Sequence, residues 1–115
     1  MNAGCPFCRP AEILLENDPA YVQRDRFPAS PRRHVSDWFE TTARERMALF
    51  DLADAAKTWL DREFHPDGYN LGINIGEAAG QTLFHVHPHL IPRYQGDVAV
   101  PRGGVRGVIP SKQSY

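Results

Sequence analysis

Three histidines, His85, His87 and His89, alternate with Val86 and Pro88 in the last third of the chain. In an extended strand, side chains two residues apart point to the same face, so these imidazoles would form one row. Imidazole titrates near neutral pH, and such a row could supply a nucleophile, a proton donor and an orienting group. A solvated polar face and a three-histidine metal site are alternative interpretations of the same pattern.

The only two cysteines, Cys5 and Cys8, form a Cys-x-x-Cys pair near the start of the chain. Two cysteines are too few for a secreted disulfide scaffold, and this spacing is typical of a metal or redox pair. A structural zinc site needs four ligands, and the remaining candidates here are histidines. Thioredoxin-like chemistry is disfavoured because the pair does not lie between a strand and a helix. Inert free thiols remain an alternative.

Short apolar segments are expected to position these side chains. Residues 13–15 and 21–22 are apolar and flank Asn-Asp-Pro at 17–19, a turn signal that predicts a hairpin. Two prolines and three arginines between residues 26 and 34 predict a loop.

A long amphipathic helix is expected after Thr42, because Thr42 and Glu45 have the spacing of a capping box. The apolar stripe that follows at helical spacing consists of Leu49, Phe50, Ala53, Ala56, Leu60 and Phe64. The helix should end before Pro-Asp-Gly at 66–68.

Two further strands are expected. Residues 69–76 alternate strictly, with Asn70 and Asn74 on the polar face. Residues 82–94 form the second strand and carry the histidine row. The tail at 101–110 should be a loop that ends in a short pairing segment.

Composition limits the classes of function. The chain has 115 residues, 42% of them hydrophobic, which fits a single domain over 1–115. Its net charge is −1, which argues against broad binding of a nucleic-acid backbone. No apolar run approaches the ~20 residues of a membrane span, and no export signal is visible, so the expected compartment is the cytoplasm. A Gly-x-x-x-x-Gly-Lys-Ser/Thr loop is absent, which removes support for kinase or GTPase chemistry.

The sequence resembles the histidine triad (HIT) family, whose signature is His-x-His-x-His followed by two apolar residues. The signature stands here at residues 85–91, His-Val-His-Pro-His-Leu-Ile. The similarity spans nearly the whole chain and includes Gly72 to Thr82, Pro92-Arg93-Tyr94, the Cys-x-x-Cys start, Asp25-Arg26-Phe27-Pro28 and the Arg-Gly-Gly-Val-Arg tail.

The resemblance implies an α+β domain with an antiparallel sheet and one main helix, usually a homodimer. Such proteins bind nucleotides and hydrolyse or transfer nucleoside monophosphate groups. The expected substrates are phosphoramidates, adenylylated amines or dinucleoside polyphosphates. The implied catalytic residues are His85, His87 and His89. His87 would attack the α-phosphorus and form a covalent nucleotidyl-histidine intermediate, and His89 would contact the phosphate or help to protonate the leaving group.

The resemblance also implies a nucleotide-binding set. Gln81 and Thr82 match positions that hydrogen-bond phosphate oxygens, and Asn74 can supply another such bond. Phe7 and Asp25 resemble the base-contacting and ribose-contacting positions. From residue type alone, Phe7 is more often a core side chain and Asp25 a surface turn carboxylate.

A zinc site follows from the same resemblance. Some bacterial HIT proteins, and the related galactose-1-phosphate uridylyltransferases, combine a Cys-x-x-Cys with a distant histidine and the first histidine of the triad. The matching residues here are Cys5, Cys8, His34 and His85. This set leaves His87 free for chemistry, and catalysis itself would require no cofactor.

The chain departs from the family pattern after Pro28. Family members usually continue with a Pro-Gly-His turn and an apolar strand, whereas residues 30–34 here, Ser-Pro-Arg-Arg-His, run directly into Arg-His. We therefore expect one strand to be shortened or missing and the activity to be weak. A non-catalytic nucleotide-binding or zinc-stabilised module is the alternative function.

Overall fold

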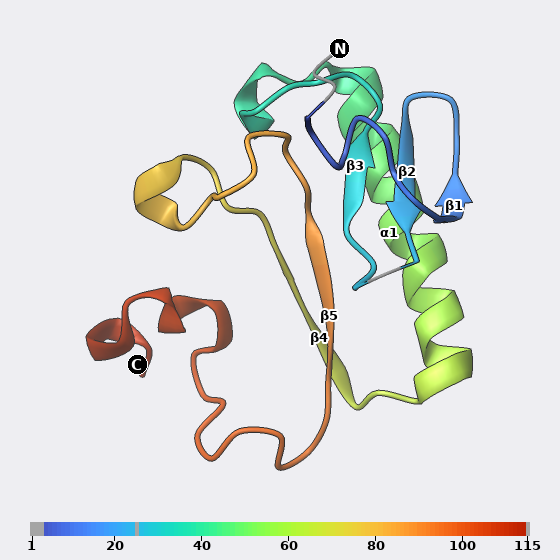
Figure 1. The fold of residues 1–115 in the computed structure, drawn as a ribbon. Helices are drawn as coiled ribbons and strands as arrows, with labels where there is room; N and C mark the ends of the chain where they lie inside the picture. Colours follow the sequence, from blue (N-terminus) through green and yellow to red (C-terminus); the bar gives the residue numbers. More distant parts are fainter. Residues whose placement is uncertain (1–3, 25, 115) are drawn as a thin grey trace.

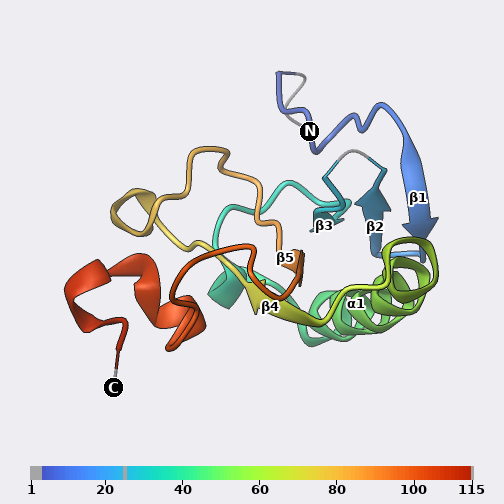
Figure 2. The same cartoon turned by 90° about the horizontal axis from the view of Figure 1, so that it is seen from below.

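The computed structural model describes residues 4–24 and 26–114. Two antiparallel sheets and one long helix form the frame of the molecule (Figure 1). The first sheet contains β1 (Ile13–Glu16), β2 (Ala20–Gln23) and β3 (Ala29–Pro31), and the second contains β4 (Gly68–Gly72) and β5 (His89–Arg93). The helix α1 (Ala43–Phe64) lies along one face of the first sheet (Figure 2).

The predicted start of α1 is confirmed. The Thr42 hydroxyl accepts from the Glu45 N–H at 3.0 Å, and the Glu45 carboxylate accepts from the Thr42 N–H at 2.8 Å, which completes the capping box. The helix ends where His65 adopts a left-handed conformation, with φ of 50°, directly before Pro66. A proline disfavours the helical conformation of the residue before it, so the chain leaves the helix there.

The core forms between α1 and the first sheet. The buried cluster consists of Ala20, Val22, Ala29, Ala48, Leu49 and Leu52. The predicted apolar stripe is wrong at two positions, because Phe50 and Phe64 are about half exposed while Leu52 is buried. Phe50 follows Leu49 directly and therefore points about 100° further around the helix, away from the packed face, whereas Leu49 and Leu52 are three residues apart and share that face.

The predicted hairpin is confirmed as β1 and β2. Asn17 closes its turn, since its side-chain Oδ1 accepts from the Ala20 N–H at 3.1 Å and its own N–H donates to the Ala20 carbonyl at 3.0 Å.

The predicted loop at 26–34 is partly wrong, because Ala29–Pro31 pairs with β2 as the three-residue strand β3. The chain from 29 to 35 then runs between β2 and the histidine segment. The Ala29 N–H donates to the Pro88 carbonyl at 3.2 Å, and the Val86 N–H donates to the Val35 carbonyl at 2.7 Å. We call this junction between the two sheets the seam. β3 is the edge strand of the first sheet, and at three residues it is short, as expected from the sequence.

The predicted strands at 69–76 and 82–94 are too long. In the β4–β5 register Gly72 pairs with His89, and the residue before His89 is Pro88. Proline has no N–H to continue the ladder, so regular pairing stops there on both strands. His85 and His87 consequently lie outside regular secondary structure, and His85 is in a bend.

The tail also differs from its prediction. It forms two short 3-10 helices, η3 (Gly104–Val108) and η4 (Pro110–Lys112), and neither pairs with a strand among the described residues. Two further 3-10 turns, η1 (Trp38–Glu40) and η2 (Glu77–Ala79), connect the main elements.

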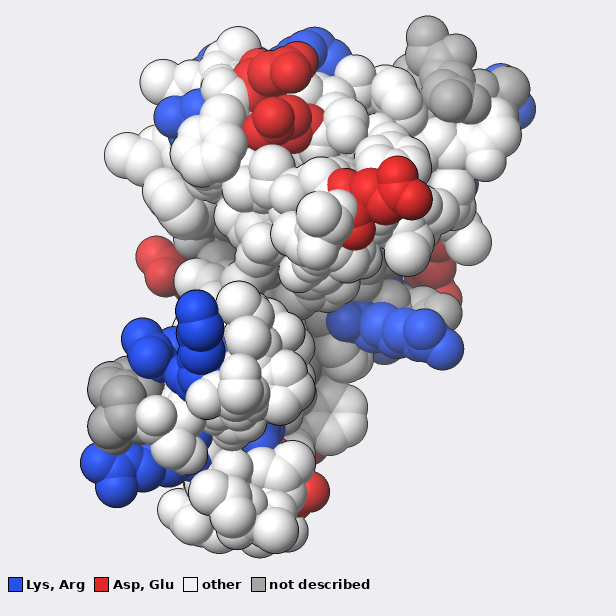
Figure 3. All heavy atoms as spheres, turned by 90° about the vertical axis from the view of Figure 1, so that its left-hand side faces the viewer, with Lys and Arg blue, Asp and Glu red and all other residues white. Residues whose placement is uncertain are grey.

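Charges of both signs are exposed on the side of the molecule that carries the C-terminal segment (Figure 3). Basic side chains predominate in the lower half of this view, whereas acidic and basic side chains both lie in the upper half. The segment after Pro101 contributes Arg102, Arg106 and Lys112 and no acidic residue. Among the described residues, no helix has the length and apolar character needed to cross a membrane.

Candidate functional site

Four metal-type ligands from three chain segments converge at the seam. The donor atoms of Cys5, Cys8, His34 and His85 all lie within 4.8 Å of one another. The Nδ1 atoms of His34 and His85 are 3.3 Å apart. The sulfur of Cys8 is 3.2 Å from His34 Nδ1 and 3.5 Å from His85 Nδ1, and the sulfur of Cys5 is 3.4 Å from His85 Nδ1.

The four pairwise distances of 3.2–3.5 Å are close to those around one tetrahedral ion. Zinc–sulfur bonds of about 2.3 Å and zinc–nitrogen bonds of about 2.0–2.1 Å place neighbouring ligand atoms about 3.3–3.8 Å apart in a tetrahedron. The donor set of two thiols and two imidazoles is also one that zinc commonly takes in structural sites. The four residues predicted from the sequence are therefore brought together in a geometry that suits zinc.

His85 is oriented for this role by the shortened strand. Its Nε2 lies 2.7 Å from the carbonyl oxygen of Pro31 and donates its hydrogen there, which leaves the lone pair of Nδ1 facing the cysteines. The side chain is fully buried, and burial lowers the pKa of His85, which favours the neutral imidazole that a metal requires.

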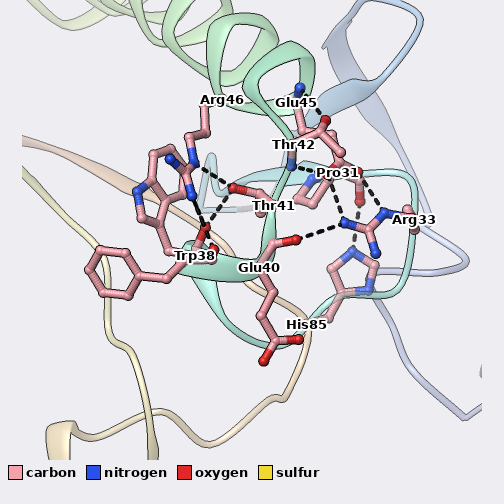
Figure 4. Close-up of polar contacts among 10 residues, drawn as sticks. Pro31, Arg33, Trp38, Glu40, Thr41, Thr42, Glu45, Arg46 and His85 are labelled. Atoms are coloured by element: carbon pink, nitrogen blue, oxygen red, sulfur yellow. Dashed lines mark hydrogen bonds and ion pairs between the residues drawn. The ribbon is translucent and has the colours of Figure 1, made fainter.

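His34 is positioned by its neighbour Arg33, whose guanidinium reaches the start of α1 (Figure 4). Arg33 binds the Glu45 carboxylate in a bidentate pair, with Nη2–Oε1 at 2.8 Å and Nε–Oε2 at 3.0 Å. Its Nη2 also donates to the Glu40 carbonyl at 3.2 Å. Because Glu45 completes the capping box, the turn before His34 is attached to a rigid helix end.

His87 does not belong to the metal cluster, and its ring lies against that of Phe7. The two rings are stacked, with centroids 4.6 Å apart and planes 20° apart. The Nδ1–H of His87 donates to the carbonyl of His85 at 2.9 Å. Nε2 therefore keeps its lone pair, which is the condition for an imidazole nucleophile.

His89 stands between two cavities. One, of about 320 Å³, is lined by His87, His89 and Phe7 together with Pro6, Gln23, Arg26, Pro28 and Leu83. The other, of about 560 Å³, is lined by His89, Asn74 and Ile73 together with Asn70, Gly72, Ile91, Gly104, Val105 and Val108. The His89 ring meets that of His87 edge-on at 4.7 Å, and burial lowers the pKa of His89. A phosphate group bound next to His87 and His89 would thus have one of the two cavities on each side.

The structure does not bring all of the predicted nucleotide-binding residues to the cavities beside the histidines. Phe7 and Asn74 line the two cavities beside the histidines. Gln81 is buried, and its side chain accepts from the Gly76 N–H at 2.8 Å and donates to the carbonyls of Ser36 and Leu83. Thr82 is exposed and lines neither cavity. Asp25 lies outside the described residues.

A sequence model of the HIT domain matches residues 8–96. The chain belongs to the HIT family. An uncharacterized HIT-like protein from Mycoplasma genitalium is 33% identical over 107 aligned positions, which cover 82% of this chain and 76% of that protein. AP-4-A phosphorylase from Mycobacterium tuberculosis is 35% identical over 68 positions, which cover 58% of this chain and 35% of the enzyme.

The fold is similar to that of a solved member of the family. A Zn-bound histidine triad family protein from Mycobacterium smegmatis superposes with a TM-score of 0.72 at 28% identity, covering 82% of this chain and 78% of the other. The predicted α+β HIT-like fold, with antiparallel strands and one main helix, is confirmed.

Sequence reasoning missed the residues that support the HIT site. The sequence pattern places Arg33 only in a loop and gives no indication of the roles of the Pro31 carbonyl and of the Tyr21 hydroxyl, which donates to the Phe7 carbonyl. The predicted capping role of Glu45 is a signal that a charged partner lies nearby. Nothing in the spacing of Tyr21 could have indicated its contact.

Proposed function

We propose that this HIT protein is a nucleotide hydrolase that releases a nucleoside 5′-monophosphate through a covalent intermediate on His87. The observation that carries the proposal is the hydrogen bond from His87 Nδ1 to the His85 carbonyl, in a ring that also lines a cavity of about 320 Å³. This bond fixes the tautomer in which Nε2 is the nucleophile.

The reaction would proceed in two displacements. The Nε2 lone pair of His87 forms a bond to the α-phosphorus while the bond from phosphorus to the leaving nitrogen or oxygen breaks, and the leaving group takes a proton from water. A second water then attacks the phosphorus, the bond to Nε2 breaks, and one proton returns to solvent. The sum is the addition of one water to the substrate, and the imidazole is restored.

We assign His89 to contact with the phosphate. Burial lowers the pKa of His89, so its neutral imidazole can donate an N–H to a phosphate oxygen but is a poor source of a full proton. Its position between the two cavities is consistent with a nucleoside on the Phe7 side and a leaving group on the Asn74 side.

The cluster of Cys5, Cys8, His34 and His85 would hold a zinc ion. With four protein ligands the ion would have no open position, so it would stabilise the fold and supply no chemistry to the displacement. The similarity to a Zn-bound histidine triad family protein supports this assignment. His87 is outside the ligand set and remains available to the substrate.

The substrates would be phosphoramidates, adenylylated amines or dinucleoside polyphosphates. The similarity to AP-4-A phosphorylase supports the last class. Because β3 is only three residues long, we expect the walls of the cavity to be held less firmly and turnover to be weak.

We also propose a homodimer. Among the described residues, β4 has β5 on one side and no strand on the other, and an unpaired edge is a template for a second chain. Leu71 and Ile91 on this sheet are about half exposed. Light scattering after size exclusion should give twice the chain mass, and a monomeric mass would contradict the dimer.

The enzymatic proposal is tested by incubation of the zinc-loaded protein with adenosine phosphoramidate. Wild type should release AMP and His87→Ala should not, while zinc content stays close to that of wild type and AMP still binds. Equal release by both proteins would refute His87 as the nucleophile. AMP binding without turnover in wild type would select the non-catalytic nucleotide-binding module, and zinc binding without AMP binding would select the zinc-stabilised module.

A further inference from the structure

The Cys-Pro-Phe-Cys loop contributes to both the metal cluster and the nucleotide cavity. Cys5 and Cys8 supply two of the four donor atoms, and Phe7 between them stacks its ring on His87. The Cys8 N–H donates to the Cys5 carbonyl at 3.1 Å, so the loop is a tight turn. A change in the position of either cysteine must therefore move Phe7.

Tyr21 attaches this loop to β2. The side chain extends from β2, is 1% exposed and donates its hydroxyl hydrogen to the Phe7 carbonyl. Burial raises the pKa of Tyr21 to about 12, so the phenol remains a donor throughout the physiological range. The hydroxyl thus anchors the loop at the residue whose ring forms a wall of the cavity.

We propose that zinc binding and nucleotide binding are positively coupled through this loop, and that Tyr21 is a positioning residue for the coupling. The inference rests on the proposed function, because it concerns the same nucleotide cavity. Metal ligation by Cys5 and Cys8 fixes the backbone on both sides of Phe7. Phe7 then presents its ring to His87 and to the bound nucleoside in one orientation.

Coupling of this kind is reciprocal. If zinc raises the affinity for a nucleotide by some factor, the nucleotide raises the affinity for zinc by the same factor. Other parts of the cavity, such as Pro28 and His89, come from different segments of the chain and do not belong to the Cys-Pro-Phe-Cys loop. Loss of the hydrogen bond from Tyr21 to the loop should therefore reduce the coupling, whereas a loss of stability elsewhere in the fold should not.

The test measures the zinc dissociation constant by competition with a chromophoric chelator, without AMP and with saturating AMP. AMP should strengthen zinc binding about five-fold or more, within the usual range for coupled sites. Calorimetric titration of zinc-loaded and chelated protein with AMP should give the same factor. Tyr21→Phe removes only the hydroxyl and should reduce the factor towards one.

Tyr69→Phe is the matched control. Its hydroxyl donates to Asp61 Oδ1 at 2.6 Å, at the junction of α1 and β4, and lines neither cavity beside the histidines. This variant also loses a hydrogen bond from a tyrosine hydroxyl, but away from the Cys-Pro-Phe-Cys loop, and should keep the wild-type factor.

Three outcomes would overturn the inference. Equal zinc affinity with and without AMP in wild type would show that the sites are independent. The same factor in wild type, Tyr21→Phe and Tyr69→Phe would show that the coupling passes through folding as a whole and not through Tyr21. Absence of AMP binding to zinc-loaded wild type would refute the proposed function itself, and the coupling with it.

Discussion

Replacement of Arg33 by methionine should cost far more stability than its place in a surface turn suggests. The Arg33–Glu45 pair joins the turn before His34 to the first turn of α1. The Glu45 side chain is only 9% exposed, whereas that of Arg33 is 52% exposed. Methionine keeps much of the apolar stem of Arg33 but leaves a nearly buried carboxylate without its cation.

The size of the expected loss of stability follows from the exposed fractions of these two side chains. Removal of one partner from a fully buried ion pair costs about 3–5 kcal/mol, and exposed pairs contribute only about 0–1 kcal/mol. Glu45 is buried, but Arg33 is half in solvent, and the carboxylate keeps its bond from the Thr42 N–H. We therefore expect a loss of about 2 kcal/mol, which for a domain of this size lowers Tm by about 8 °C.

Urea denaturation at pH 7 measures the loss, with Arg44→Met as the matched control. Arg44 lies 3.7 Å from Asp18, and both side chains are highly exposed, so this change should cost less than about 0.5 kcal/mol. A similar penalty for both variants would refute the argument from burial.

The pH dependence gives a second check on Arg33. Its hydrogen bonds hold the pKa of Glu45 below the usual range. A carboxyl group with a lowered pKa in the folded state contributes its full stability above its unfolded pKa of about 4.3, and this contribution is lost as pH falls through the folded pKa. The difference between wild type and Arg33→Met should therefore shrink below about pH 4. A penalty that stays constant down to the lowest pH at which both proteins fold would contradict this assignment.

Three other tests, one of them with a control variant, address separate features. Cys8→Ser should reduce metal content from about one zinc per chain to near zero and lower stability, because ligation and folding are coupled; mass spectrometric metal analysis decides this, and retained zinc would contradict the four-ligand set. Gly76→Ala should cost about 1–3 kcal/mol in urea denaturation, because its φ of 89° suits glycine. Gly72→Ala, with open space at its Cβ position, should change stability little, and equal effects would refute the backbone argument. Thr42→Ala should cost about 1 kcal/mol through loss of the capping box; unchanged urea stability would mean that solvent replaces the cap.

Local patterns predicted the local elements well. The Asn17 turn and the Thr42 cap act over three or four residues, and both are present as expected. The lengths of β4 and β5 could not be read in the same way. Alternation of residue type predicts a strand on its own, but a ladder ends where its partner lacks an N–H, which Pro88 determines from a distant part of the chain.

The metal ligands were predictable only through the family resemblance. The Cys5–Cys8 spacing indicated a metal or redox pair, but His34 is 26 positions from Cys8 and no periodicity connects them. Gln81 shows that a residue whose type suits a ligand can have a structural role instead. Its amide suits a phosphate, yet the folded chain uses it to hold the turn at Gly76, a choice that depends on tertiary structure.

The seam has a consequence for the unfolded chain as well. Within the described residues it is joined by two backbone hydrogen bonds and the bond from His85 to Pro31. The ligand pairs that meet there are 26, 51 and 80 positions apart. An ion held by all four would join these distant segments only in the folded chain, so its binding free energy would favour folding and would be absent from the disordered chain. Zinc would then serve this short-stranded domain as disulfides serve small secreted ones, with both cysteines engaged by the metal.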